Sequence, residues 1–588
     1  MAQAQAAGAD IIMVRSGSTL SGSDASIVLQ DGQMLLGDAT GVEHWIPTSQ
    51  FASFLLPHAS NGTTLPTLLN ATGDSVTLAS NSTLAGFRIE GPNGSGIFAD
   101  GITNAIVRDV DIVNAGANGI DLHNIHGNLD FTRTHVEGAN ATIVNPLLTN
   151  SSGLRIEGGD AEVKFDGMIE NSAGNQVAVI GTTGGHVDLT KAIIQSNVGG
   201  GVAVRDAAGD VTFKDVTLSN TIGDGISVQG GNGTVRFLGQ TSLTSVFGKG
   251  VKIDGLLDGG LVQFDNLWMD QRQDVGIDLN NIGGSVQFAG NTVIQAGNGI
   301  NTAGIDFQNS SGAVTFNNID LVGGGAGIHM GSLLNESTGS FQVNGTTNIS
   351  SVSGPGIHIY DDSASVLFNR VEIANRQAEG ILIDGGRGFV QFTDTVGISN
   401  GLGAGAAGIV IENSTGNFEF AEANINNATG MGGVRIEDNS GSTLFQNLNI
   451  NSQNGVGLFA KNGGNLYVYD GNLQTTGASA VDLETTNLSA QFTTVSSSGG
   501  NVGMRFKGTT GTFVVTGDGT ENSGGTIQGA DRGIVIEDST GISLQDMLVY
   551  NNRVGIDADD AGTLLFNRFN INNSTDDAIQ ATNTTNLT

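Results

Sequence analysis

Short segments that alternate apolar and other residues, each introduced by a glycine, recur along most of this chain. Residues 533–538 read Gly-Ile-Val-Ile-Glu-Asp, and residues 408–413 and 433–438 are near copies. A period of two is typical of a β-strand, and it places both isoleucines of residues 533–538 on the inside and the valine on the outside. From Gly201 onward the segments begin roughly 22 to 30 residues apart. A repeat of this length indicates a solenoid of stacked turns.

A phenylalanine follows many of these glycines at a constant distance of twelve positions. The phenylalanines are Phe131, Phe165, Phe213, Phe237, Phe288, Phe316, Phe368, Phe392, Phe420 and Phe445, and Phe492 stands twelve positions after Ala480. The path from the first strand to the phenylalanine is therefore constant, and insertions must fall later in the turn. Three positions further on, another apolar residue opens a short third strand, as at residues 371–373.

Three short strands per turn predict an all-β fold, a parallel β-helix of about 20 turns. Its interior would hold an aliphatic ladder and a phenylalanine ladder, with neighbouring rungs at the ~4.8 Å spacing of paired strands.

Two regions near the start depart from the repeat. Residues 9–38 contain strand-like segments without its period, and a solenoid closes its open end with an atypical cap. Residues 44–72 hold several prolines and little periodicity, so we expect a lateral excursion over the first turns. We predict an N-terminal cap and excursion over residues 1–74 and one continuous β-helix domain over residues 75–588, with an irregular insertion at residues 137–152.

Composition narrows the class of protein. The 588 residues carry a net charge of −34, although only 14% of them are charged. Such a chain repels nucleic acid, whose binding needs clustered Lys and Arg. No apolar segment approaches the ~18 residues that a membrane-spanning helix needs, so we predict no transmembrane segment. The chain has no cysteine, which excludes disulfides but assigns no compartment.

Residues 118–122 read Asn-Gly-Ile-Asp-Leu, and residues 298–300 repeat the Asn-Gly-Ile part. In this phrase the chain resembles the right-handed parallel β-helix proteins of the pectin-lyase-like superfamily. Residues 26–37 are similar to the start of bacterial surface β-helices associated with inverse autotransporters. These resemblances imply an extracellular or cell-surface protein, and residues 1–8 are similar to the small-residue stretch near a signal-peptidase cleavage site. The superfamily includes polysaccharide lyases, hydrolases, epimerases, tailspikes and adhesins, so the fold leaves the function open.

Equivalent outward positions of successive turns form columns, and a binding site would interrupt such a column. Asp306, His329 and His358 hold one outward position in three successive turns. Two stacked histidines beside a carboxylate suit substrate binding or acid–base chemistry, and we assign Asp306 and His329 to substrate binding. A solvated polar column is the plainer alternative.

Adjacent acids are the second candidate. Glycoside hydrolysis uses two carboxylates ~5 to 10 Å apart. Asp361 and Asp362 follow His358 closely, and Arg370 comes soon after them. We therefore assign Asp361, Asp362 and His358 to catalysis and Arg370 to substrate binding. Hydrolases of the resembling superfamily also carry a Gly-His-Gly motif, which this chain lacks, and aspartates are common in turns for their own backbone hydrogen bonds.

We predict no metal site. His123, His126 and His135 crowd one turn, but their spacing fits no metal-binding signature. A second outward column consists mostly of carboxylates, among them Asp384 and Glu412, and gives that face at most a weak affinity for calcium. The repeated Gly-Gly-x-Gly-x-Asp calcium motif is absent. We expect no cofactor other than weakly bound calcium.

The leading hypothesis is a secreted or cell-surface β-helix that acts as a rigid structural or adhesive passenger or spacer. Its partners would be surface glycans or other cell-surface components. The alternative is a carbohydrate-active enzyme (a polysaccharide hydrolase, lyase or epimerase) or a glycan binder without turnover. An enzyme predicts a cleft where acids and histidines converge, whereas a spacer predicts dispersed groups. Two tryptophans and four tyrosines offer few aromatic platforms for sugars.

Overall fold

The structure, a computed structural model, describes residues 8–46, 53–139, 151–196, 199–297, 299–333, 336–403, 406–429 and 432–588. The chain forms two compact units, Met1–Asn291 and Thr292–Thr588, and each is described by itself. Three predicted features fall wholly or mostly outside the described residues. They are the signal-peptide-like start, most of the insertion at residues 137–152, and Asn298 of the second Asn-Gly-Ile phrase.

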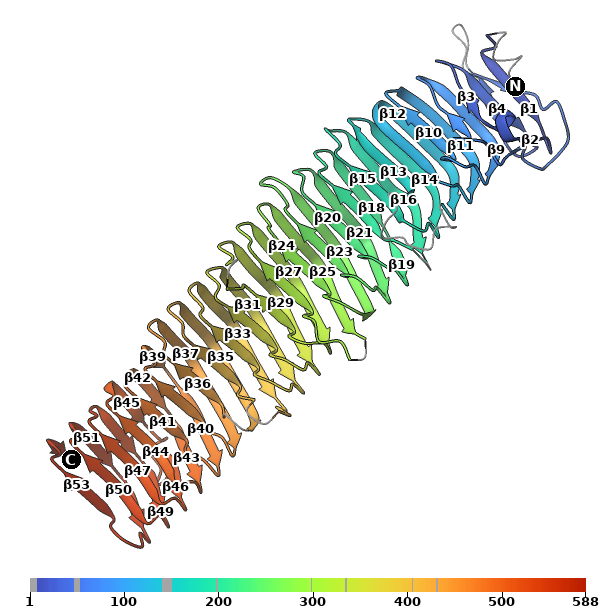
Figure 1. The fold of residues 1–588 in the computed structure, drawn as a ribbon. Helices are drawn as coiled ribbons and strands as arrows, with labels where there is room; N and C mark the ends of the chain where they lie inside the picture. The colour runs from blue at the N-terminus through green and yellow to red at the C-terminus, as the bar shows by residue number, and fades with distance from the viewer. Residues whose placement is uncertain are drawn as a thin grey trace. The chain divides into compact units, whose positions relative to one another are not determined.

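Both units are parallel β-solenoids, as predicted. Strands make up 60% of the chain and helix 1%, and the units together comprise about 23 turns. Figure 1 shows the strands of successive turns side by side within each unit. The only helix among the described residues is a short 3-10 helix, Gly22–Ala25.

Each complete turn contributes strands to two sheets, here called sheet A and sheet B. Sheet B takes the short glycine-led strands, and sheet A takes the segments that follow. In the first unit, for example, β20 (Ile226–Gln229) of sheet B pairs in parallel with β17 (Val202–Arg205) and β22 (Val251–Asp254). The next strand, β21 (Thr234–Thr244), pairs with β23 (Leu261–Arg272) in sheet A.

The sheet B strands carry the sites discussed below. In the first unit they include β10 (Ile97–Asp100), β12 (Ile120–Glu137, which continues into sheet A), β13 (Ser152–Gly159), β15 (Asn175–Ile180), β17, β20, β22 and β24 (Ile277–Asn280). In the second unit they are β26 (Ile305–Gln308), β28 (Ile328–Met330), β30 (Ile357–Tyr360), β32 (Ile381–Asp384), β34 (Ile409–Glu412), β36 (Val434–Glu437), β38 (Leu458–Lys461), β41 (Val481–Glu484), β44 (Val502–Lys507), β47 (Arg532–Glu537), β50 (Val554–Asp559) and β53 (Ile579–Thr582).

Three separate strands per turn, as predicted from the sequence, are found in only some turns. In many others the second and third segments form one strand, as in β31 (Ser365–Ala374). A register shift between Phe368 and Val371 leaves β31 continuous, because a bulge in the neighbouring strand of the next turn takes up the extra residue. In other turns the two segments are separate strands, as in β39 (Asn465–Val468) and β40 (Gly471–Thr476), which keep one register with the preceding turn.

A residue in the left-handed conformation follows the sheet B strand in turn after turn. Asp361, Gly385 and Asn413, at the ends of β30, β32 and β34, have φ of 47°, 71° and 53°. Gly, Asn and Asp tolerate this conformation better than other residues. A Cβ atom on Gly385 would also lie 2.5 Å from Asp361 Oδ1. This corner keeps one shape, which explains the constant twelve-residue distance from glycine to phenylalanine.

The predicted phenylalanine ladder is confirmed inside both units. Its members are at most 1% exposed, and consecutive rings in the regular parts stack with centroids 4.5 to 5.4 Å apart and nearly parallel planes. These stacks are Phe213, Phe237, Phe264 and Phe288 in the first unit and Phe368, Phe392, Phe420 and Phe445 in the second. Truncating one such ring to alanine typically costs ~3–5 kcal/mol, so the ladder is a principal source of stability.

One turn of the second unit lacks a phenylalanine at the ladder position and fills the space with a phenylalanine from a nearby position. Val343 stands in register between Phe316 and Phe368, where a phenylalanine would be expected. Phe341, two residues earlier, is fully buried and lies tilted against both phenylalanines, with centroids 5.4 and 5.9 Å away. The volume missing at Val343 is thus filled from the neighbouring inward position.

The predicted alternation of the repeat strand is also confirmed. Ile534 and Ile536 of β47 are fully buried. Val535 lies between them on the outer face, yet it is only 2% exposed. Its register partners on the two neighbouring turns are Arg505 and Asp557, whose longer side chains flank it. At this position the outer face of sheet B is therefore packed, whereas the outward residues of many other sheet B strands are half-buried.

The first strands of the chain already belong to the solenoid sheets. β1 (Ile11–Arg15) pairs in parallel with β4 (Met34–Asp38), and β4 pairs with β9 (Ser82–Glu90). β7 (Thr67–Leu69) also joins sheet A, between β2 (Thr19–Ser21) and β9. The predicted domain boundary at residue 74 stays a prediction.

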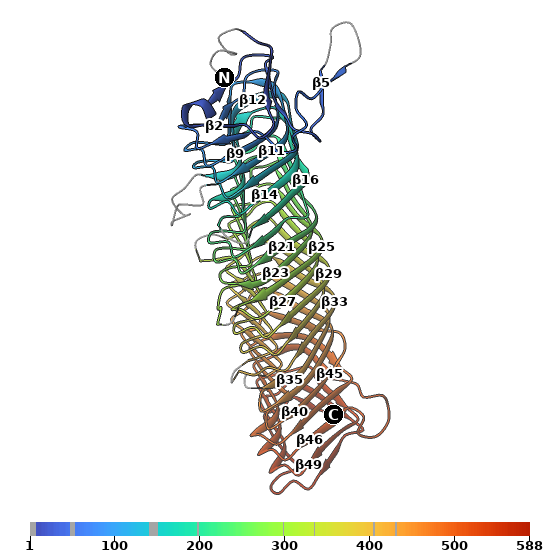
Figure 2. The same cartoon turned by 90° about the vertical axis from the view of Figure 1, so that its right-hand side faces the viewer.

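A hairpin lies outside the two solenoid sheets, within the stretch predicted as a lateral excursion. β5 (His44–Ile46) and β6 (Phe54–Leu56) pair antiparallel, and Figure 2 shows β5 beside the stacked strands. Ile46 packs against Leu36 and Ala85 of the solenoid. One face of the hairpin is thereby anchored to the first turns.

A buried cation ties down one of the longer loops of the second unit. Arg376 is 1% exposed, and its guanidinium donates hydrogen bonds of 3.0 Å to the backbone carbonyls of Ser399 and Ala407. Burial lowers the pKa of Arg376 to about 10, so it stays charged at neutral pH. The two carbonyls hold the ends of the loop that separates β33 (Phe389–Ser399) from β34.

Candidate functional site

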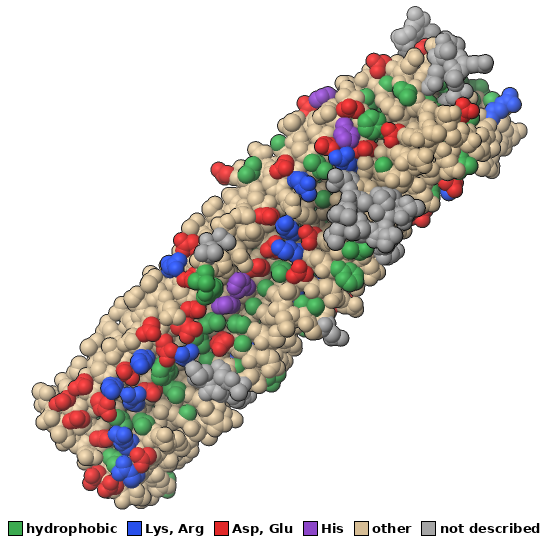
Figure 3. Space-filling model, viewed as in Figure 1, with side chains coloured by type: hydrophobic (Ala, Val, Ile, Leu, Met, Phe, Trp, Pro, Cys, Tyr) green, Lys and Arg blue, Asp and Glu red, His purple; other side chains and the backbone are tan. Residues whose placement is uncertain are grey.

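The outer face of sheet B carries two columns of side chains, as the sequence predicts. In the second unit the first column runs Asp306, His329, His358, Leu382, Val410, Arg435, Phe459, Asp482, Arg505 and Val535. The second column, two residues further along each strand, includes Tyr360, Asp384, Glu412, Glu437, Lys461 and Glu484. Figure 3 shows charged and histidine side chains gathered into a band.

The structure brings Asp306, His329 and His358 together on β26, β28 and β30. His329 Nδ1 lies 2.8 Å from Asp306 Oδ1, and the rings of His329 and His358 have centroids 5.2 Å apart. Tyr360 borders the pair, with its ring centroid 5.7 Å from that of His358. Asp306 also accepts hydrogen bonds from the side-chain amide of Gln308. This group forms one continuous polar patch.

His358 is a neutral imidazole at neutral pH. Burial and the neighbouring His329 together lower its pKa to about 4, while Asp384 acts in the opposite direction. A general base works best when its pKa lies near the working pH. A histidine with a pKa near 4 is a weak base, so its assignment to catalysis gains nothing from this environment.

Asp361 occupies the left-handed corner after β30, where Asn, Asp or Gly stands in other turns. Its carboxylate accepts a hydrogen bond of 2.8 Å from Arg387 Nη2, and Arg387 also pairs with Glu336. The corner conformation and the ion pair account for an aspartate at this position.

Asp362 points inward and is 2% exposed. Its Oδ1 accepts hydrogen bonds of 3.0 Å from the backbone N–H groups of Ser337 and Ala364, while Oδ2 has no hydrogen-bond partner among the described residues. Burial raises the pKa of Asp362 to about 6. In the turn of β34 a serine, Ser414, holds the position and accepts a hydrogen bond from the preceding turn in the same way. Asp362 is therefore part of a structural row of turn-to-turn hydrogen bonds.

Arg370 lies on sheet A, in β31, and does not join the histidine patch. It is exposed and donates hydrogen bonds of 3.1 and 2.7 Å to Glu372 Oε1. The predicted set thus divides into one patch of Asp306, His329 and His358 and three separate local arrangements around Asp361, Asp362 and Arg370. Catalysis by any of them stays a prediction.

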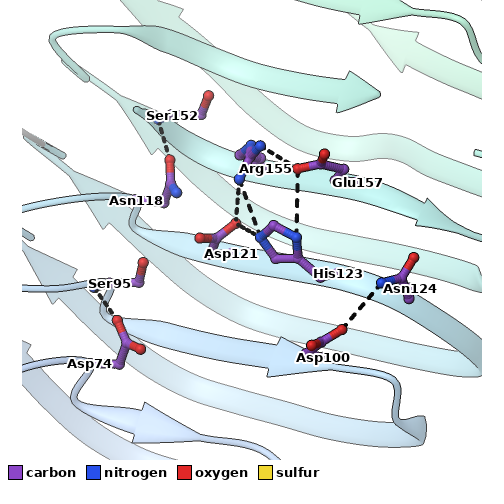
Figure 4. A network of polar contacts seen from close by, with 10 residues as sticks. All are labelled: Asp74, Ser95, Asp100, Asn118, Asp121, His123, Asn124, Ser152, Arg155 and Glu157. Atoms are coloured by element: carbon purple, nitrogen blue, oxygen red, sulfur yellow. Dashed lines mark hydrogen bonds and ion pairs between the residues drawn. The ribbon is translucent and has the colours of Figure 1, made fainter. Parts of the chain in front are cut away.

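The first unit has its own histidine cluster on sheet B, which Figure 4 shows. His123 Nε2 lies 2.9 Å from Asp121 Oδ1, and His123 Nδ1 lies 3.5 Å from Glu157 Oε2. Arg155, on the next turn, reaches Asp121 at 3.5 Å and also pairs with Glu157. Each acid is thus shared between a histidine and an arginine.

A second cluster of the first unit lies on sheet A, and the sequence did not predict it. His135 Nδ1 lies 2.9 Å from Asp111 Oδ1, and His135 Nε2 lies 3.0 Å from Glu170 Oε1. Ligand atoms of His135, Glu137 and Glu170 all lie within 4.8 Å of one another, so these residues could hold a metal ion.

The three histidines that crowd residues 123–135 do not converge. His123 faces outward from sheet B, His126 bonds to Asp160 at the corner, and His135 belongs to sheet A. Glu137 and Glu170 are register partners 33 residues apart, because this turn contains the insertion at residues 137–152. The His-x-Glu pair at residues 135–137 was the available sequence signal, since alternation puts both side chains on one face.

Two shallow depressions lie on the outer surface of the second unit. One, of about 280 Å3, is lined by Phe459, Arg435, Glu437, Asn454 and Val456, among others. The other, of about 360 Å3, lies over a row of asparagines on sheet A. In that row Asn449 donates to Asn424 and Asn472 donates to Asn449, with bonds of 2.9 and 3.0 Å.

Comparison of the chain with protein-family models, with curated proteins and with solved structures finds no match. Parallel β-solenoid architecture is thus what the structure establishes, and membership of the pectin-lyase-like superfamily or a relation to inverse autotransporters stays a prediction. Over the ranges that the structure describes, no helix is long and apolar enough to cross a bilayer.

Proposed function

We propose that the protein is a secreted or cell-surface β-solenoid that acts as a rigid structural or adhesive passenger or spacer. The observation that carries this proposal is the pairing of charges along the outer face of sheet B. Arg435 pairs with Glu412 of the preceding turn and with Glu437 of its own strand, whereas Arg505 pairs with Asp482 and Glu484, both on the preceding turn. Three of these carboxylates, Glu412, Asp482 and Glu484, are engaged in cross-strand pairs, which support the sheet.

Catalysis would ask for a different arrangement. A hydrolase needs two carboxylates directed at one bond, with one of them able to donate a proton. Here Asp361 pairs with Arg387, and Asp362 is buried in the row of turn-to-turn hydrogen bonds. The arrangement favours a surface that presents contacts over one that performs chemistry. Calcium, if bound, would be held weakly by the carboxylate column.

A glycan ligand is the second candidate, and the depression at Phe459 favours it. Phe459 offers a half-buried aromatic face, and Arg435, Glu437 and Asn454 surround it with hydrogen-bonding groups. Ligand sites typically combine an apolar floor with a few polar groups that fix orientation. We propose that an adhesive role would use this depression for a neutral or weakly charged sugar.

The test is a panel of neutral and weakly charged polysaccharides, assayed for binding and for reducing-end or unsaturated products. We expect no turnover and, for an adhesive role, binding that falls at least tenfold in F459A. Tyr469, a 58% exposed aromatic residue outside the depression, provides the matched control Y469A, which should bind as the wild type does. Turnover that D361N or D362N abolishes would instead identify a carbohydrate-active enzyme. Absence of both binding and turnover would leave the spacer role.

A further inference from the structure

The cluster around His135 has the composition of a transition-metal site. His135 stands on β12, and Glu170 is on β14 (Glu162–Glu170) of the next turn. Two ligand atoms that are each ~2.0–2.2 Å from a zinc ion lie at most ~4 Å from each other. The ligand atoms of His135, Glu137 and Glu170 are within 4.8 Å of one another. Small rotations of these partly exposed side chains would bring all three onto one ion.

An independent feature orients the histidine for this role. Asp111, on β11 (Thr103–Val113) of the preceding turn, lies 2.9 Å from His135 Nδ1, on the side of the ring opposite Glu170. Metal-binding histidines almost always donate their other ring N–H to a carboxylate, carbonyl or water, which fixes the tautomer and leaves the second nitrogen for the metal. Asp111 is itself held by an ion pair with Arg88, which also pairs with Glu90.

The two glutamates supply a further reason for a cation. Glu137 and Glu170 are register partners on adjacent turns, and like charges at such positions repel. On sheet B an arginine relieves the same conflict, as Arg435 does for Glu412 and Glu437. Among the described residues no Lys or Arg pairs with Glu137 or Glu170. Gln195 donates a hydrogen bond of 2.9 Å to Glu170 Oε2, which leaves Oε1 directed at His135.

The ligand set selects the class of ion. One imidazole nitrogen and two carboxylate oxygens suit zinc and neighbouring first-row divalent ions. Calcium takes six to eight oxygen ligands and has no use for an imidazole. Three protein ligands also leave a zinc ion one position for water or another ligand.

We propose that His135, Glu137 and Glu170 form a binding site for a zinc-class divalent cation, with Asp111 as the positioning residue of His135. The site lies on sheet A of the first unit, apart from the sheet B surface of the proposed function, and stands or falls independently of it.

The test is titration of the metal-free full-length chain with Zn2+ by calorimetry, with Co2+ absorption as a second readout of nitrogen and oxygen coordination. We expect one saturable Zn2+ site in the wild type. H135N and E170Q should each weaken it at least tenfold, and D111N should weaken it severalfold. Excess Ca2+ should leave Zn2+ binding nearly unchanged.

The matched control is H126N. His126 Nδ1 pairs with Asp160 Oδ1 of the next turn but has no third ligand close by among the described residues. H126N should bind Zn2+ as the wild type does. Equal losses in H126N and H135N, an unchanged affinity in both H135N and E137Q, or displacement of Zn2+ by equimolar Ca2+ would each overturn the proposal. Circular dichroism of every variant separates loss of the site from loss of the fold.

Discussion

The histidines of the two units sit in opposite electrostatic settings although the same stacking places them. In the first unit His123 and His135 each stand between two carboxylates from the same or neighbouring turns. In the second unit His329 has one carboxylate partner, and His358 is half-buried beside an imidazole. A solenoid therefore gives a histidine neighbours from adjacent turns, which lie more than twenty positions distant in sequence.

The largest expected effect is the pH dependence of stability caused by His358, and replacing this histidine would remove the contrast between the units. Its pKa of about 4 in the folded protein lies below the 6.5 of an unperturbed histidine, so the unfolded chain binds the proton more tightly. The stability that neutral His358 supports is fully present above pH 6.5 and is lost as the pH falls through 4, by about 3 kcal/mol. Between pH 7 and 4, H358Q should gain about 3 kcal/mol in unfolding free energy relative to the wild type.

Denaturant titrations of both proteins at pH 7, 5.5 and 4 measure this difference. H329Q is the control, because it removes the neighbouring imidazole and leaves His358 in place. Parallel stability profiles for the wild type and H358Q would contradict the prediction.

Asp362, four residues after His358, should cause a slightly smaller pH dependence of stability, of opposite sign. The pKa of Asp362, about 6 in the folded protein, lies above the ordinary 3.8, so the folded state binds the proton more tightly. The stability gained from protonated Asp362 is present below pH 3.8 and is lost as the pH rises through 6. Between pH 4 and 7, D362S should gain about 2 kcal/mol relative to the wild type.

Serine is the substitution of choice because Ser414 fills the equivalent position. The wild-type profile between pH 4 and 6 should be nearly flat, since the effects of His358 and Asp362 oppose each other there. In each single variant the unfolding free energy should therefore change with pH over this range, although it is nearly constant in the wild type. A D362S profile that parallels the wild type would show that the Asp362 carboxyl titrates normally.

The smallest expected effect is the loss of stability when Arg155, beside His123 in the first unit, is replaced. Arg155 pairs with Asp121 and Glu157, and Asp121 is 8% exposed. R155Q would remove the guanidinium that pairs with Asp121 and leave His123 as its ion-pair partner among the described residues, at a cost of about 1–2 kcal/mol. The control R370Q removes an exposed arginine that pairs only with Glu372, and surface pairs of this kind are worth ~0–1 kcal/mol. Equal losses in denaturation midpoint for R155Q and R370Q would count against the special role of Arg155.

The sequence was sufficient to predict the register of the core. The twelve-residue distance between glycine and phenylalanine is easy to recognise because both residues have fixed positions. The close packing of turns fixes the glycine, and the stack of rings fixes the phenylalanine. The sequence could not predict whether the second and third segments of a turn form one continuous strand. That depends on backbone hydrogen bonds across a bulge, as at Phe368 and Val371, and no residue type marks their continuity.

The candidate site was harder to predict. Asp361 and Asp362 look like a pair in sequence, but the left-handed corner at Asp361 turns the chain, so one side chain points outward and the other inward. The strand alternation that worked elsewhere does not extend through that corner. His135 and Glu170 were missed for a related reason, because an insertion lengthens their turn and breaks the regular spacing.

The contrast between the constant corner and the variable loops has a practical consequence for engineering. Leu402 lies in a loop whose ends Arg376 holds, and its side chain is 61% exposed. A foreign peptide grafted beside Leu402 would extend into solvent while the strands on either side kept their pairing. Grafts in the matching loops of successive turns would be separated by multiples of ~4.8 Å, so the protein offers a scaffold with regular spacing for multivalent display.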